Sequence, residues 1–167
     1  PEAVSMRSFG YSTLSTLCVR VPQLLRPDLS LVALLFGALP REDAGARTAL
    51  QEALAALAAV HAPPADGGSA GAATAATPPA VLQKLRGLLL DAAAADSPHA
   101  RLSAVVWAGR VFPPEDVVAR YVCLLGASDK RPEVRDEGLK RLRPPNWKPP
   151  PTTPAGLLSE EKAAAPA

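Results

Sequence analysis

The chain has 167 residues, of which 48% are hydrophobic but only 4% aromatic, so alanine and leucine carry most of its apolar weight. This composition favours helices over sheets, and the length suits one modest domain. The 18 lysines and arginines are interleaved with 16 aspartates and glutamates, which argues against a nucleic-acid-binding protein, because such proteins cluster positive charge on one face.

Membrane insertion is not expected, because no run approaches the about 20 apolar residues of a membrane span and no signal peptide is visible. The two cysteines, Cys18 and Cys123, each lie in an apolar run. We expect both to be buried as small hydrophobic residues in a reducing compartment. The chain begins with Pro1 rather than methionine, which is consistent with an internal piece of a longer protein.

The first predicted elements are two helices over 28–39 and 45–60, because their apolar residues recur at helical spacing. Asp28 is expected to cap the first helix, and Pro40 to end it. The short connection between the two helices predicts an antiparallel helix hairpin.

A segment rich in Ala, Gly, Pro, Thr and Ser follows over 61–79 and predicts a flexible loop. Four more helices are expected after it. The apolar residues of all four follow a helical period, and the last three begin with a capping residue or with proline in the first turn. Their ranges are 81–89, 98–112, 115–125 and 128–142, and Gly126 is expected to stop the third of them.

The chain is expected to divide into helical repeats over 1–143 and a proline-rich tail over 144–167, which predicts a disordered segment or linker. A strand pattern competes with the helical one only over 17–21. The remaining apolar spacing predicts an all-α protein.

Three of the predicted helices have an arginine near their start: Arg47, Arg101 and Arg135. Three residues after the last two of these stand the small residues Ala104 and Gly138. Arg101 and Arg135 are 34 residues apart, and a period in the thirties with paired helices is typical of an α-solenoid.

The stretch DKRPEVR, 129–135, indicates the kind of solenoid, because it resembles the D-x-x-P-x-V-R opening of a second helix in HEAT repeats. Asp129 would order the turn, Pro132 would set the first helical φ angle, and Val134 would enter the core. The predicted fold is therefore an α-solenoid of HEAT-like antiparallel helix pairs. The alternative is an unrelated helical bundle with similar caps.

No catalytic, cofactor-binding or metal-binding residue is predicted. His61 opens the predicted loop, and His99 lies in a first helical turn, without the partners at fixed spacing that a metal site needs. Neither cysteine has a neighbouring base that would make it a nucleophile. Trp107 lies in an apolar stripe and is expected in the core.

The charged residues of the last predicted helix are either a solvated face or a partner-binding face. Trp147, isolated among prolines, is either a docking anchor or packed against the last repeat. The candidate partner-binding residues are Lys130, Arg131, Lys140, Arg141 and Trp147.

Two stretches go beyond generic HEAT features. They cover 28–54 and 105–142, about two-fifths of the chain, and they resemble the proteasome adaptor and scaffold family, whose members are very long HEAT solenoids. The residues that carry the resemblance are Phe36, Arg47, Gln51, Glu52, Ala53 and Leu54 in the first stretch, and Val111, Phe112, Pro113, Arg120, Tyr121, Asp129 and Val134 in the second.

The resemblance implies a non-catalytic scaffold that binds the 26S proteasome and tethers its core and regulatory particles, with flanking HEAT repeats in the same chain. It also implies a cytoplasmic and nuclear location. The Ala/Gly-rich loop and the proline-rich tail depart from the family pattern, so no family contacts are assigned to them. The alternative function is a HEAT-repeat adaptor of another type, in nuclear transport or as a phosphatase scaffold.

Overall fold

A computed structural model of the chain describes residues 2–26, 29–63 and 77–143. Within these ranges every regular element is an α-helix, so the all-α prediction is confirmed. The helices are α1 (Glu2–Arg20), α2 (Pro22–Leu25), α3 (Ser30–Ala38), α4 (Ala44–His61), α5 (Pro79–Ala93), α6 (Pro98–Val111), α7 (Val117–Ala127) and α8 (Pro132–Leu142).

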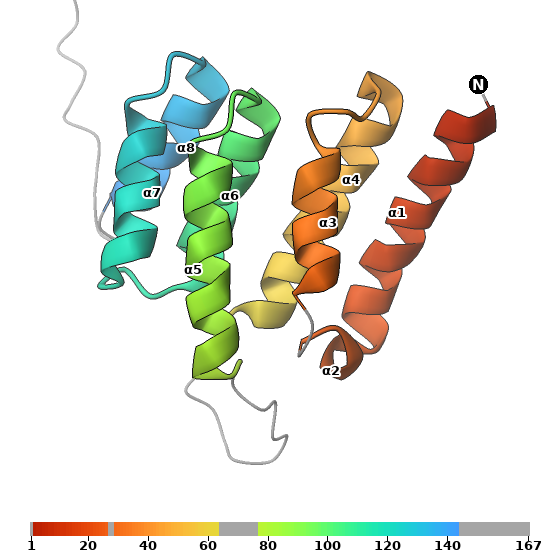
Figure 1. Ribbon diagram of the computed structural model, residues 1–167, viewed down its shortest axis with the longest axis horizontal. Helices are drawn as coiled ribbons and strands as arrows, with labels where there is room; N and C mark the ends of the chain where they lie inside the picture. Colours follow the sequence, from red (N-terminus) through yellow and green to blue (C-terminus); the bar gives the residue numbers. More distant parts are fainter. Residues whose placement is uncertain (1, 27–28, 64–76, 144–167) are drawn as a thin grey trace, which may run out of the picture.

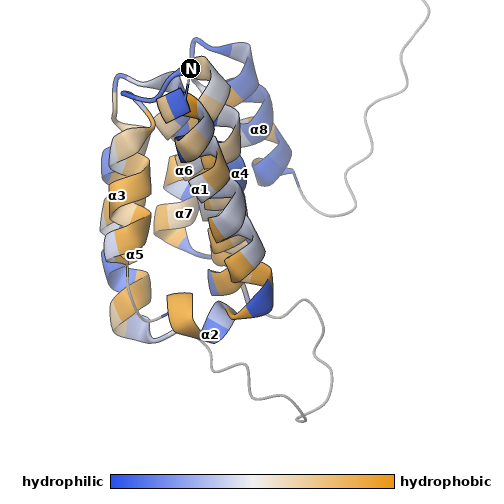
Figure 2. Cartoon of the chain, turned by 90° about the vertical axis from the view of Figure 1, so that its right-hand side faces the viewer, coloured by the Kyte–Doolittle hydropathy of each residue, from blue (hydrophilic) through white to orange (hydrophobic). Residues whose placement is uncertain are grey.

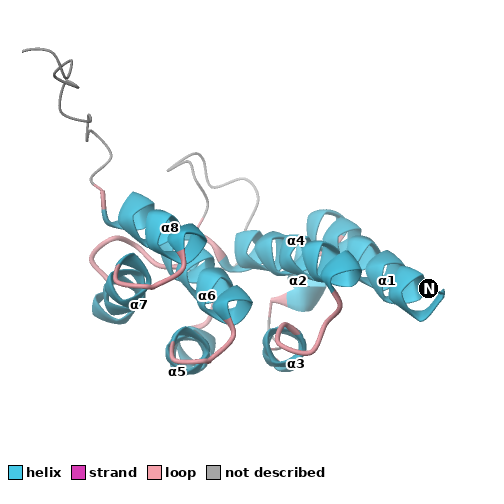
Figure 3. Cartoon of the chain, turned by 90° about the horizontal axis from the view of Figure 1, so that it is seen from above, coloured by secondary structure: helices cyan, strands magenta, loops and turns pink. Residues whose placement is uncertain are grey.

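The helices from α3 onward form three antiparallel pairs, α3/α4, α5/α6 and α7/α8, which lie side by side (Figure 1). Seen from above, α3, α5 and α7 form one layer and α4, α6 and α8 the other (Figure 3). α1 packs against α4 and closes one end of the row. The turns inside the pairs, 39–43, 94–97 and 128–131, therefore lie along one edge, which we call the turn edge.

Proline starts several of these helices. The sequence predicts this for Pro98 and Pro132, but Pro79 was expected in the loop and instead begins α5. Pro79, Pro98 and Pro132 all stand in a first helical turn, where the missing N–H group costs nothing. α7 begins instead with a side-chain cap, because the Asp116 carboxylate accepts a hydrogen bond of 2.9 Å from the Ala119 N–H group. Ser97 takes the expected position before α6, but its hydroxyl makes no capping bond.

One hydrophobic core runs through the row of helices from α1 to α8. Trp107 of α6 is fully buried at the centre of this core, as predicted, and its ring meets Phe36 of α3 edge-on at a centroid distance of 5.7 Å. Both cysteines are buried, which confirms that expectation. Apolar residues dominate α3, whereas α8 is mostly hydrophilic (Figure 2).

The N-terminal part of the chain corrects the sequence interpretation. The helix α1 was not predicted, nor was the single turn α2, and the candidate strand at 17–21 is wrong because α1 continues to Arg20. The buried side of α1 is partly polar, with Arg7 and Tyr11 bonded to Glu42 of the turn before α4. Such a helix lacks the regular apolar periodicity from which the sequence could predict it.

His61 also corrects the predicted loop. It is the last residue of α4 and only 2% exposed, with its ring centroid 5.9 Å from that of Trp107. The loop therefore begins after His61, because this ring contributes to the core. The rest of the predicted loop at 64–76, Asp28, and the whole predicted tail with Trp147 lie outside the described residues.

Candidate interaction surface

The turn edge carries a series of arginine bridges that join one helix pair to the next. Arg101, in the first turn of α6, binds Asp129 in the turn before α8 with two bonds, of 2.6 Å from Nε and 3.1 Å from Nη2. Its Nη1 atom also donates to the carbonyl oxygens of Ala95 and Asp96, in the turn before its own helix. These bonds hold the pKa of the Asp129 carboxyl below its usual value, so the pair stays charged.

Arg47 occupies the same place in α4. It donates to the carbonyl oxygen of Glu42 in the turn before its helix, and its Nη1 atom lies 3.2 Å from Nε2 of His99 in α6. Since a guanidinium has no acceptor, Nε2 of His99 must be the unprotonated ring nitrogen. Burial and the charge of Arg47 lower the pKa of His99, which favours this neutral form.

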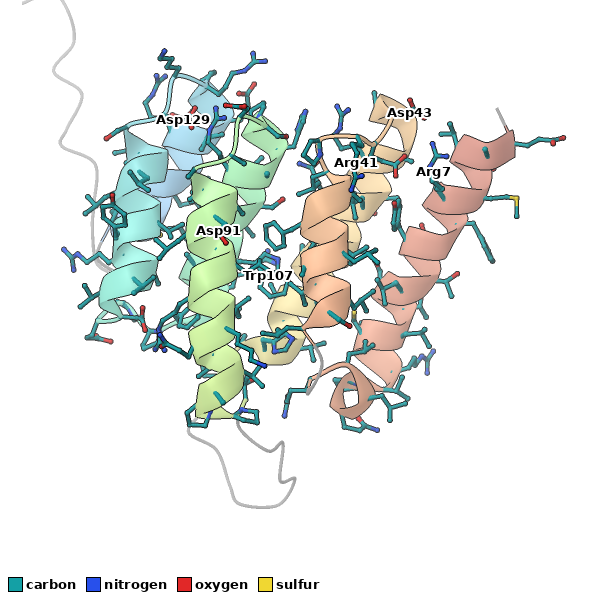
Figure 4. All side chains as sticks on the ribbon, viewed as in Figure 1. Arg7, Arg41, Asp43, Asp91, Trp107 and Asp129 are labelled. Atoms are coloured by element: carbon teal, nitrogen blue, oxygen red, sulfur yellow. The ribbon has the colours of Figure 1, made fainter. Side chains whose placement is uncertain are left out.

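A third bridge joins α1 to the α3/α4 turn. Arg7 donates to Glu42 at 2.8 Å and to Asp43 at 2.7 Å, and Tyr11 donates its hydroxyl to Glu42 at 2.7 Å. The Tyr11 hydrogen bond makes the largest contribution to lowering the pKa of the buried Glu42 carboxyl. Figure 4 shows Arg7 and Asp43 facing each other at this edge, with Asp129 farther along it.

The arginines found by sequence spacing therefore have a shared geometric role. Arg47 and Arg101 each hold their own turn through a backbone carbonyl and reach a side chain of the next pair. Arg135 stands at the equivalent place in α8 and is exposed at the end of the row. Arg7 was missed in the sequence analysis, because this residue lies on α1 and does not share the repeated position of Arg47, Arg101 and Arg135.

A second kind of arginine bridge lies within the layer of α4, α6 and α8, farther from the turn edge. Arg110 of α6 donates from Nη1 to the carbonyl oxygen of Ala55 in α4 at 3.2 Å. Arg141 of α8 lies against Gly109 of α6, where a Cβ atom would come within 2.3 Å of the Arg141 Cδ atom. Arg141 also donates from Nη1 to the carbonyl oxygen of Gly109 at 3.4 Å, so arginine bridges join α4 to α6 and α6 to α8 in addition to apolar packing.

The candidate partner-binding residues do not gather at one point. Lys130 and Arg131 are exposed at the start of α8, whereas Lys140 and Arg141 lie at its end, about 15 Å away along the helix axis. Arg141 is partly committed within the fold, because it binds Glu137 at 2.7 Å. Their role in partner binding remains a prediction.

Apolar side chains are exposed at both ends of the row. On α7 the exposed fractions are 80% for Val117, 53% for Tyr121 and 50% for Leu124. On α1 both Met6 and Phe9 are 75% exposed. These residues face away from the buried sides of their helices, so each terminal helix presents a second, partly apolar face.

The two cysteine thiols are buried in the hydrophobic core. Burial raises the pKa of both Cys18 and Cys123, the opposite of what activates a thiol nucleophile. Across 2–26, 29–63 and 77–143, no cluster of three or more His, Cys, Asp or Glu side chains could hold a metal ion. In the same ranges, no helix combines the length and apolarity needed to span a membrane.

These features define an all-α protein of antiparallel helix pairs joined by arginine bridges. The family model described as "Proteasome component ECM29, N-terminal" matches residues 1–126, and the chain belongs to this family. The family resemblance drawn from the sequence is thereby confirmed, and the match extends it to α1.

Among known proteins, the human protein named "Proteasome adapter and scaffold protein ECM29" is 31% identical to this chain over 147 residues. The matched part is 85% of this chain but 7% of the human protein, so the chain spans a small part of its relative's length. No solved structure matches the chain.

Proposed function

We propose that the chain is part of a HEAT-type α-solenoid that serves as a non-catalytic scaffold of the proteasome, tethering its core and regulatory particles. Membership of the ECM29 N-terminal family carries this proposal. The human relative, which matches 85% of the chain, is named an adapter and scaffold protein, and this name supports the same proposal. The alternative of a nuclear-transport or phosphatase adaptor has no comparable support.

The structure supports the scaffold role through its arrangement of surfaces. HEAT solenoids stack helix pairs so that each pair contacts only its neighbours, and their extended faces bind partners. The antiparallel pairs of this chain, with an arginine bridge at each step, fit that architecture. The exposed apolar faces of α1 and α7 suit further helix pairs of the same solenoid.

The association is tested by native purification. A protein carrying this chain, tagged away from 1–167, is isolated from extract at low salt with ATP present, and the co-purified proteins are identified by mass spectrometry. Both core and regulatory subunits are expected. Failure to recover any proteasome subunit would refute the proteasome assignment, whereas recovery of one particle alone would refute the tethering role.

The partner-binding role of α8 needs charge changes that leave the fold intact. Lys130→Glu with Lys140→Glu is suitable, because both lysines are exposed. The matched control is Lys84→Glu with Arg120→Glu, which makes the same change in charge on exposed residues of α5 and α7. If α8 binds a partner, only the first pair of substitutions weakens proteasome recovery. Equal recovery from both variants would assign these lysines to a solvated surface.

A cytoplasmic and nuclear location belongs to the same proposal. Imaging of the tagged protein tests it, and fluorescence confined to any other compartment would contradict it. No cofactor is invoked for this function.

A further inference from the structure

Both histidines of the chain lie at the same junction, between α4 and α6. His61 ends α4 and lies beside Trp107 of α6, with the ring centroids 5.9 Å apart. At the other end of the junction, Nε2 of His99 in α6 accepts a hydrogen bond from Nη1 of Arg47 in α4. About 20 Å of helix separates Arg47 from His61, so the two histidines flank the length of this junction.

His99 can hold Arg47 only while its Nε2 atom is unprotonated. A proton on that atom would remove the acceptor and place two positive charges 3.2 Å apart. The charged groups that face His99 are Arg47 from α4, Arg131 from the turn before α8, and Glu133 from α8. Only Glu133 favours protonation, and burial together with the two arginines outweighs it, so the pKa of His99 is lowered.

His61 disfavours protonation for a different reason. Both of its ring nitrogens are buried without a hydrogen-bond partner among the described side chains and backbone. The charged group that faces it is Arg26, which follows α2 and donates to the carbonyl oxygen of Val60. A proton on His61 would therefore create a buried charge beside a cation, and burial is the larger cause of its lowered pKa.

The neighbouring junction, between α6 and α8, is built differently. There the bridge is the Arg101–Asp129 pair, at 2.6 Å. The hydrogen bonds from Arg101 hold the pKa of the Asp129 carboxyl below its usual value, so this carboxylate stays charged in mild acid. Mild acid therefore leaves this bridge intact, although the two junctions have arginines in the same place.

We propose that the α4/α6 junction is a pH-sensitive joint, which holds α1–α4 against α5–α8 at neutral pH and loosens on mild acidification while the α6/α8 junction stays closed. Protonation of His99 releases Arg47, and protonation of His61 is possible only when its ring leaves Trp107 for water. The joint thus gives the scaffold a bend that responds to pH. This property goes beyond the proposed adaptor role and does not depend on it.

The direction follows from linkage. Both groups have a lower pKa in the closed junction than the about 6.5 of a solvated histidine, so the open form binds more protons. Closure is complete above that value and weakens as the pH falls below it. Between about pH 7.5 and about pH 5.5, each histidine can raise the opening equilibrium constant by at most about 10-fold, and both together by about 100-fold.

The test uses the 167-residue chain with Trp147→Phe, which leaves Trp107 as its single tryptophan. Its fluorescence and its hydrogen exchange, corrected for the intrinsic pH dependence of exchange, are measured at both pH values. We expect a reversible red shift of the Trp107 emission at the lower pH. We also expect loss of amide protection in α4 and α6 that exceeds any loss in α8.

The comparison variant carries His61→Leu and His99→Gln. Leucine fills the buried site without a titratable group, and the glutamine carbonyl oxygen can accept from Arg47 at any pH. This variant should lose the pH response. The proposal is overturned if the parent shows no response, or if a folded variant responds as strongly as the parent.

A second measurement stands even if that variant does not fold. Titration of the two histidine rings in the parent by nuclear magnetic resonance should give both pKa values below the solvated value of about 6.5. A value at or above it for either ring would refute a joint made of both histidines.

Discussion

Substituting Gly138 by alanine should destabilise the chain, although alanine is the better helix former. Gly138 is buried in α8 where that helix crosses the end of α7. A Cβ atom there would come within 2.3 Å of the Ala127 backbone nitrogen, 2.7 Å of the Gly126 carbonyl carbon and 2.9 Å of the Ala127 Cα atom. All three are backbone atoms, so no side chain can rotate away and the two helices must move apart by about 1 Å.

The magnitude follows from two opposing effects. Overpacking of this kind costs about 1–3 kcal/mol and occasionally more, while replacing a helical glycine by alanine gains about 1 kcal/mol. Because the Gly138 contacts are all with backbone, we place the cost at the upper end and expect a net loss of about 1–2 kcal/mol in the free energy of unfolding. Val134, fully buried one turn earlier on α8, would lose packing as the helices separate.

Three other glycines supply graded controls. A Cβ atom at Gly126 would lie 2.5 Å from Cγ2 of Val105, a stiff and buried side chain, so a smaller loss is expected. At Gly109 it would meet only the flexible Arg141 side chain, and the effect should be close to neutral. At Gly87 nothing lies within 4 Å, so alanine should stabilise the chain by about 0.5–1 kcal/mol.

Urea unfolding followed by far-ultraviolet circular dichroism measures these differences through the transition midpoints at constant slope. The expected order of stability is Gly87→Ala above the parent, Gly109→Ala near it, then Gly126→Ala, and Gly138→Ala lowest. A Gly138→Ala variant as stable as Gly87→Ala would refute the close helix crossing on which the reasoning depends.

Trp107→Ala should lower the free energy of unfolding by about 3–5 kcal/mol in the same assay, and Trp107→Asp by more, because it buries a charge. Asp116→Ala removes the cap of α7 and the partner of Arg86, so a loss of about 1–2 kcal/mol is expected by urea unfolding. The pKa of the Asp129 carboxyl is lowered in the fold, so its contribution to the free energy of unfolding should be complete above about pH 4 and be lost as the pH falls through the folded-state pKa. Asp129→Asn should therefore flatten the acid side of a curve of stability against pH. Lys130→Asp, on the exposed turn, should leave the thermal midpoint unchanged, and a clear loss would show that this turn is packed.

Apolar spacing and helix-start signals together predicted α3 to α8, because most of these helices bury several apolar residues at helical spacing, whereas α8 buries only Val134 and Gly138. Proline marked the starts of α6 and α8, since it suits the first turn and disrupts later ones, whereas Pro79 was assigned to the loop although it begins α5. Gly126 was expected to stop a helix, and α7 does end one residue later, but this glycine also serves the close approach to Val105. The sequence indicated the first role, whereas the second depends on the packing of α7 against α6.

The interactions of α1 could not be predicted in the same way. Its contact with the turn before α4 uses an arginine, a tyrosine and a buried glutamate, and polar packing has no periodic signature. The partner of Arg101 was hidden for a related reason. Arg101 and Asp129 were each singled out, but they are 28 residues apart and only the packing of helix pairs brings them together.

The edge opposite the turn edge has a consequence for engineering. α4 ends at His61 and α5 begins at Pro79 at this edge, and α6 ends and α7 begins there as well, so the bridges of Arg47 and Arg101 lie at the other end of these helices (Figure 1). Loop closure depends only weakly on length, since each doubling costs about 0.6 kcal/mol. A fluorescent or affinity domain placed between α4 and α5 would therefore leave the register of neighbouring helix pairs unchanged, which makes this connection the natural point at which to add a reporter.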